Sequence, residues 1–159
     1  TTGGVNRVNA RNGKISEIIT EGDKPRGSNR AIATPDQLAA AGPDVVVVDD
    51  NGRPWSWRPS NSAGAGTLRR VTLQGNPTFQ DDHGDLAAYA PANGSPYRMY
   101  VAEPSLNQVM RYQWTLDGSA FQPPTDYLSS ATAEVTDFDQ LYVDFNVYAL
   151  IDNALRRYE

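Results

Sequence analysis

The chain has 159 residues, a formal net charge of -5 and 39% hydrophobic residues, which predicts one or two globular domains with a substantial core. It has no cysteine and one histidine, His83, which excludes a disulfide framework, a thiolate zinc site, a cysteine nucleophile and any site with several histidines. The acidic balance argues against general binding to nucleic acids or anionic membranes, because both require clustered cations.

Taken in chain order, the expected elements are strands, which begin with a hairpin around Asn12-Gly13. A second Asn-Gly pair, at Asn51-Gly52, follows a run of four valines, and such pairs tolerate the positive φ angles of tight hairpins. Residues 34–41 are rich in helix-forming side chains, but their match to later segments favours a strand or a short turn. No apolar run approaches the roughly 20 residues of a membrane helix, so no membrane insertion is expected in this segment.

The expected strands recur in a fixed order at intervals of about 50 residues. Each unit has a segment built around leucine, then an apolar or aromatic run, then a strand rich in arginine and aromatic residues. These three families lie at 36–40, 84–88 and 139–143; at 45–48, 97–101 and 147–150; and at 53–58, 108–112 and 154–158. Residues 5–10 fit the third family, and residues 66–73 and 124–129 are expected to be the fourth strands of their units.

Four-stranded antiparallel units at this period are typical of β-propeller blades. The sequence therefore predicts an all-β fold, namely a partial β-propeller of about three four-stranded blades, with a β-sandwich as the alternative. We expect a single region over 1–159, with the end of one blade at 1–33, blades at 34–82 and 83–133, and an incomplete blade at 134–159.

The repeats resemble the bacterial propeller superfamily with NHL-like or YWTD-like blades, with no subfamily assigned. The residues that carry the resemblance are the leucines of the first family and the ends of the Arg-aromatic strands, which are Leu38, Leu86, Leu141, Arg58, Tyr112 and Tyr158. The Ala-Gly-rich loop after Arg58 also resembles propeller tails that follow signalling domains.

The predicted number of blades is too small to close a ring, because closed propellers typically have four to eight blades. An open arc leaves the faces and edges of its end blades exposed. We therefore expect the chain to be a fragment of a longer protein whose remaining blades complete the ring, or else to pair with a second chain.

Two groups of ionisable residues are candidate metal sites, and Ca²⁺ is the possible cofactor. The first is the run from Asp81 to Asp85, which includes His83 and for which a solvated turn is the alternative. The second is set by the resemblance: propeller lactonases hold a metal at the axis with carboxylates and amides, which implies a site formed by Asp36, Asp85 and Asp139. The alternative is that these aspartates stabilise turns.

Aromatic residues with a neighbouring arginine form the third candidate site, which would bind a glycan, another small molecule or a protein partner. Its members are Trp55, Trp57, Arg58, Tyr112 and Trp114. Packing between adjacent blades is the alternative for these rings, since large residues at equivalent strand positions fill the space between sheets.

The function expected from these observations is a non-enzymatic interaction or ligand-sensing module of a larger bacterial protein, with an extracytoplasmic location favoured. The composition leaves few catalytic groups, and a repeated scaffold with variable loops suits binding. Two alternatives remain open: a metal-dependent propeller hydrolase that uses Asp36, Asp85, His83 and Asp139, and a carbohydrate-binding propeller that uses Trp55, Trp57 and Trp114.

Overall fold

The computed structural model describes residues 3–60, 66–75, 79, 84–91, 97–104, 108–116, 119–128, 138–151 and 153–158. These residues form strands and no α-helix, so none of them belongs to a helix that could cross a membrane. In chain order the strands are β1 (Gly4–Val8), β2 (Ile15–Thr20), β3 (Pro35–Ala41), β4 (Asp44–Asp49), β5 (Pro54–Pro59), β6 (Gly66–Arg70), β7 (Thr72–Leu73), β8 (Leu86–Tyr89), β9 (Arg98–Glu103), β10 (Gln108–Gln113), β11 (Ala120–Phe121), β12 (Thr125–Leu128), β13 (Phe138–Val143), β14 (Val147–Ile151) and β15 (Ala154–Tyr158).

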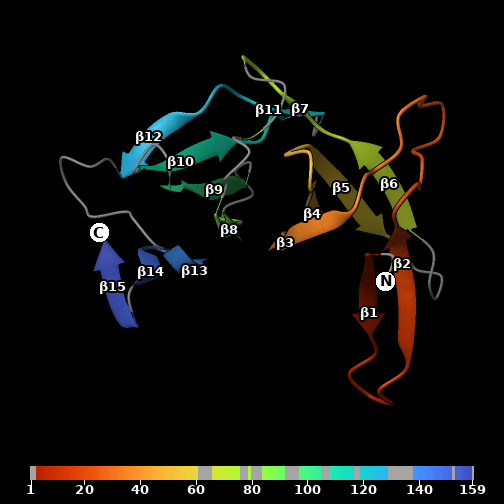
Figure 1. Cartoon of the computed structure of the whole chain (residues 1–159), viewed down its shortest axis with the longest axis horizontal. Coiled ribbons are helices and arrows are strands. Elements are labelled where there is room, and N and C mark those ends of the chain that lie inside the picture. The colour runs from red at the N-terminus through yellow and green to blue at the C-terminus, as the bar shows by residue number, and fades with distance from the viewer. Residues whose placement is uncertain are drawn as a thin grey trace.

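The strands form a series of antiparallel sheets that follow one another along an open arc (Figure 1). The β1-β2 hairpin lies at one end, and the sheets β3-β4-β5-β6 and β8-β9-β10-β12 come next. The three-stranded sheet β13-β14-β15 lies at the other end. In each of the last three sheets the first strand, namely β3, β8 or β13, lies on the inner side of the arc, and β3 and β13 both contact β8.

The turns that the sequence predicts have the expected geometry where the structure describes them. Gly13 and Gly52 have φ angles of 67° and 65°, which a side chain would disfavour, and each closes a hairpin after an asparagine. Within residues 34–41, for which the sequence favours a strand or a short turn, Pro35–Ala41 form strand β3 and pair with β4. The expected fourth strand at 66–73 is divided at Val71: β6 completes its own sheet, and β7 pairs in parallel with β11.

Among the described residues, the buried hydrophobic side chains form three clusters, and each cluster lies between two consecutive sheets. Ile19 of the first sheet packs with Trp55 and Trp57 of the second, and Val46 of the second packs with Met99 of the third. The third cluster joins the third sheet to the last, with Tyr100, Val109, Leu141, Val143 and Val147 among its members. Burying one such side chain contributes about 1.5–3 kcal/mol, so sheet-to-sheet packing is the main stabilising contact of the arc.

Candidate functional site

The three aspartates of the predicted axial metal site have different surroundings. Asp36 and Asp139 are exposed, whereas Asp85 is half-buried immediately before β8. The backbone N–H of Leu141, on the inner strand of the next sheet, donates a hydrogen bond of 2.6 Å to Asp85 Oδ2. The backbone carbonyl of Asp85 accepts a second bond, from the N–H of Ala102. Asp85 therefore joins the inner strands of two consecutive sheets.

The described residues contain no group of three or more His, Cys, Asp or Glu side chains placed to hold a metal ion. Asp81, Asp82 and His83 of the other predicted cluster lie outside the described residues. The metal site and its Ca²⁺ stay predictions, and so does the hydrolase that would depend on them.

The predicted aromatic site is buried between the sheets. Trp55 is 0% exposed and Trp57 4% exposed, and both belong to the cluster between the first and second sheets. Tyr112 and Trp114 lie in the cluster between the second and third sheets, where Trp114 makes an edge contact with Phe121 at a ring centroid distance of 4.5 Å. This burial favours the packing alternative, while ligand binding by these rings stays a prediction.

Arg58, also predicted as a binding residue, is engaged by a buried carboxylate. Its Nε and Nη2 atoms donate hydrogen bonds of 2.7 Å to the two carboxylate oxygens of Asp44 on β4. Tyr97, which precedes β9 of the next sheet, donates a third bond of 2.7 Å from its hydroxyl to Asp44 Oδ2. The three side chains therefore connect the second and third sheets by polar contacts.

The electrostatics of this group follow from its hydrogen bonds. Burial alone would raise the pKa of Asp44, but the bonds from Arg58 and Tyr97 and the charge of Arg58 outweigh it and lower that pKa. Burial and the Asp44 carboxylate raise the pKa of Tyr97, and Asp44 likewise raises the pKa of Arg58. Asp44 is thus held ionised, and its contacts are structural.

A second buried carboxylate, Asp49, organises the turn between β4 and β5. Its Oδ1 accepts hydrogen bonds from the backbone N–H groups of Asn51 and Arg53, at 3.1 and 3.0 Å. Its Oδ2 accepts bonds from the N–H of Ala33, at 3.2 Å, and from the indole Nε1 of Trp55, at 2.9 Å. Asp49 therefore fixes the tight turn, the loop before β3 and the Trp55 ring at once.

The roles of Asp44 and Asp49 are absent from the sequence-based predictions, although the sequence holds a signal for them. The two aspartates flank four consecutive valines in a strand that the pattern marks as buried. Aspartate is almost never fully buried without partners, so such a strand predicts polar contacts at both of its ends.

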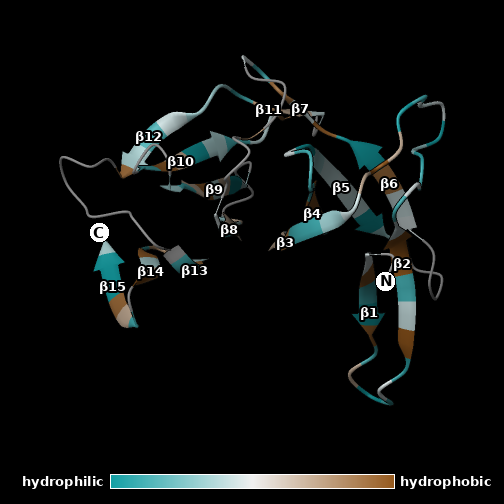
Figure 2. Cartoon of the chain, viewed as in Figure 1, coloured by the Kyte–Doolittle hydropathy of each residue, from teal (hydrophilic) through white to brown (hydrophobic). Residues whose placement is uncertain are grey.

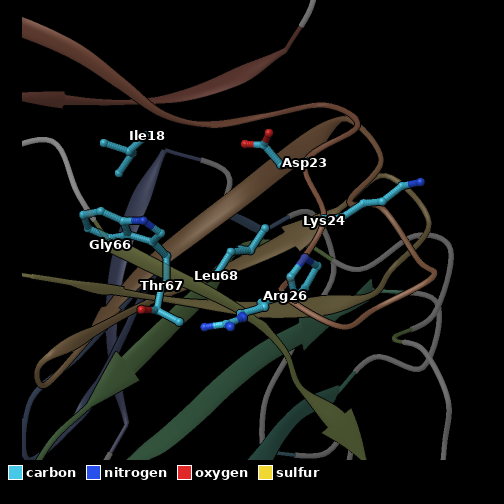
Figure 3. A pocket seen from close by; sticks show the side chains of 9 residues that line it. Ile18, Asp23, Lys24, Arg26, Gly66, Thr67 and Leu68 are labelled. Atoms are coloured by element: carbon cyan, nitrogen blue, oxygen red, sulfur yellow. The ribbon is translucent and has the colours of Figure 1, made fainter.

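A groove of about 400 Å³ lies between β2, the loop at 21–34 and β6 (Figure 3). Its apolar lining comes from Ile18, Pro25, Trp57 and Leu68. The loop also contributes an acid and two exposed cations, which are Asp23, Lys24 and Arg26. This groove is absent from the sequence-based predictions. The sequence signal that points to it is the length of the 21–34 connection, since long loops are often functional.

Close backbone approach fixes one wall of the groove. Gly66, the first residue of β6, lies against the indole of Trp57, and a Cβ at position 66 would overlap the ring. On the opposite side of the groove, the backbone N–H of Thr20 donates a hydrogen bond of 2.9 Å to Asp23 Oδ2. Among the described residues neither Lys24 nor Arg26 forms an ion pair, so both cations face solvent at the rim.

No protein-family model matches the sequence, and no curated protein matches it significantly. The fold is similar to the crystal structure of Mala s 1, the major allergen of Malassezia sympodialis, with a TM-score of 0.67 at 9% sequence identity. The match covers 96% of this chain and 44% of that protein, which is a β-propeller. The fold is that of a partial β-propeller. The predicted fold class is confirmed, and the bacterial family stays a prediction, because this identity supports the fold alone.

Proposed function

We propose that the chain is a non-enzymatic binding module of a β-propeller, and that its contact site is the groove between β2, the 21–34 loop and β6. The observation that carries this proposal is the combination of an apolar wall with two solvent-facing cations in one cavity of about 400 Å³. The groove bridges the outer strands of two consecutive sheets, β2 and β6, so the propeller packing itself determines its width.

The chemistry of the groove favours a ligand that carries both a carboxylate and a flat apolar face. Lys24 and Arg26 provide charge-assisted hydrogen-bond donors, while the partly exposed side chains of Ile18 and Leu68 provide apolar surface. Acidic sugars combine these two features, since the axial C–H groups of a pyranose ring pack on apolar side chains. The ligand class that we propose is therefore an acidic glycan, in keeping with the glycan alternative of the sequence analysis.

Calorimetric titration with a uronic-acid oligosaccharide, beside a neutral oligosaccharide of equal length, tests this proposal. We expect binding of the acidic ligand only, with an affinity that falls as the salt concentration rises. The double variant Lys24→Ala, Arg26→Ala should lose at least tenfold in affinity, whereas Arg30→Ala should bind normally. Arg30 is a matched control because it is exposed in the same loop and does not line the groove.

Equal binding of the two oligosaccharides, or unchanged affinity in the double variant, would overturn the assignment of the groove. Lys24 and Arg26 are exposed, so their replacement should leave folding unchanged, and thermal unfolding of each variant checks this directly.

A further inference from the structure

The last sheet, β13-β14-β15, has two faces of different exposure. Leu141, Val147 and Ala149 are buried against the third sheet. The residues that alternate with these along each strand lie on the opposite face of the sheet. On that face Tyr142 pairs directly with Tyr148 of the neighbouring strand, and Leu150 pairs with Leu155. Tyr142 and Leu155 are 63% and 74% exposed. These four residues line one side of a hollow of about 570 Å³, whose other side includes Leu38, Asp85 and Leu86 at the inner strands of the two preceding sheets. The face is therefore apolar, and Tyr142 and Leu155 leave it open to solvent.

The corresponding faces of the two preceding sheets are covered. Val46 and Val48 of β4 are fully buried against the third sheet, and Tyr100 and Val109 are buried against the last sheet. In each case the covering element is the next sheet along the arc. The open face of the last sheet thus has the position and the apolar character of an inter-sheet face, and it continues a type of interface that the described residues form three times within the chain.

The first sheet has an open face as well. Val5 and Ile19 are buried against the second sheet, while Val8 and Ile15 form a cross-strand pair on the opposite face. Val8 and Ile15 are 60% and 65% exposed. Figure 2 shows hydrophobic stretches at the start of β2 and at the start of β15, at the two ends of the arc. Within the part of the chain that the structure describes, each end of the arc therefore presents large apolar side chains that are more than half exposed.

We propose that a second copy of this chain covers these faces, with the last sheet of each copy packed on the first sheet of the other. Such head-to-tail pairing, applied twice, gives a closed two-fold ring in which neither apolar face stays exposed. The similar propeller supports this occupant, because one copy spans 44% of its length and two copies would span most of it. The charges of the two faces are complementary. Arg157 pairs with Tyr148 on the open face of the last sheet, and Glu17 lies on the exposed face of the first sheet.

Sedimentation equilibrium of the 159-residue chain, with single variants at each end, tests the pairing. The wild type should have twice the monomer mass of 17.4 kDa. Leu155→Lys and Ile15→Lys should each be monomeric, because each variant places a charge in both interfaces of the ring. Leu116→Lys should remain dimeric, because Leu116 is 92% exposed and lies on neither face.

Mixing the two monomeric variants distinguishes head-to-tail pairing from any other contact. In a mixed pair, the last sheet of the Ile15→Lys copy and the first sheet of the Leu155→Lys copy are both native, so one interface is intact. The mixture should therefore form a dimer that neither variant forms alone. A monomeric wild type, a dimer that survives either end substitution, or no dimer in the mixture would overturn the proposal.

Discussion

Tyr97 donates a hydrogen bond of 2.7 Å to Asp44, which joins the residue just before β9 of the third sheet to the first residue of β4 in the second. Arg58 pairs with the same carboxylate in a bidentate contact. Bidentate arginine-carboxylate pairs are among the stronger and more directional hydrogen-bonded contacts in proteins. The apolar clusters supply most of the sheet-to-sheet stability, and this polar contact adds a fixed register between the second and third sheets.

The stability of the protein should depend on pH through Asp44. The pKa of Asp44 in the folded state is lowered from the ordinary value of 3.8. Around and below pH 3.8 the folded state therefore binds fewer protons than the unfolded state. The stabilisation is complete above pH 3.8 and is lost as the pH falls through the lowered pKa. Urea unfolding at several pH values should therefore show that Asp44→Asn lowers the free energy of unfolding most near neutral pH and progressively less in acid. A cost that does not change with pH would contradict the role of the Asp44 charge.

Replacing Asp49 should destabilise the second sheet strongly. Asp49→Ala leaves four donors without their acceptor, one of them the buried indole of Trp55, and should lower the free energy of unfolding by about 3 kcal/mol. Asp49→Asn keeps one acceptor oxygen and should cost about half as much. Asp50→Ala is the matched control, because Asp50 is the exposed neighbour in the same turn. Equal stability of Asp49→Ala and Asp50→Ala in chemical denaturation would refute this account of the turn.

A side chain at position 66 should disturb the groove. Gly66→Ala places a methyl group on the indole of Trp57, and this overpacking should cost about 1–3 kcal/mol and shift the tryptophan emission. Thr67→Ala, at the exposed adjacent position of β6, should leave both unfolding and emission nearly unchanged. If Gly66→Ala matches Thr67→Ala in both measurements, Gly66 does not set the wall of the groove.

Asp85 should act through its hydrogen bond to Leu141 and without a metal. Asp85→Ala should lower the free energy of unfolding by about 1–2 kcal/mol, and the loss should be the same with Ca²⁺ or with a chelator. Asp139→Ala, at an exposed position, should change stability by no more than about 0.5 kcal/mol. A rise in Tm of the wild type with Ca²⁺ that Asp85→Ala abolishes would support the axial metal site instead.

The repeats predict the sheets because strand periodicity and turn residues are local properties of the sequence. The leucine segments, the apolar or aromatic runs and the Arg-aromatic strands form the first three strands of their sheets in the predicted order. The polar contacts between sheets are not local: Asp44 and Tyr97 are brought together only by the angle at which two sheets pack. The same geometry decides that Asp85 meets the backbone of Leu141, which no motif in the sequence specifies.

The aromatic residues also show that local sequence patterns do not determine which side chains are buried between sheets. Alternation in β5 places Trp55 and Trp57 on one face, but it does not tell whether that face meets solvent or another sheet. The structure places both rings against the first sheet, and only Trp57 also lines the groove. The groove forms only where the 21–34 loop lies beside β6. That position depends on tertiary contacts, which a local sequence pattern does not specify.

A double-mutant cycle on Asp44 and Tyr97 tests most directly the central claim, that consecutive sheets pack face to face as blades of a propeller. The free energies of unfolding of the wild type, Asp44→Ala, Tyr97→Phe and the double variant are measured by urea denaturation at neutral pH. Because the hydroxyl of Tyr97 bonds to the carboxylate across two sheets, we predict a coupling energy of about 1 kcal/mol or more. Additive effects of the two substitutions would contradict the contact and with it this packing of the second sheet on the third.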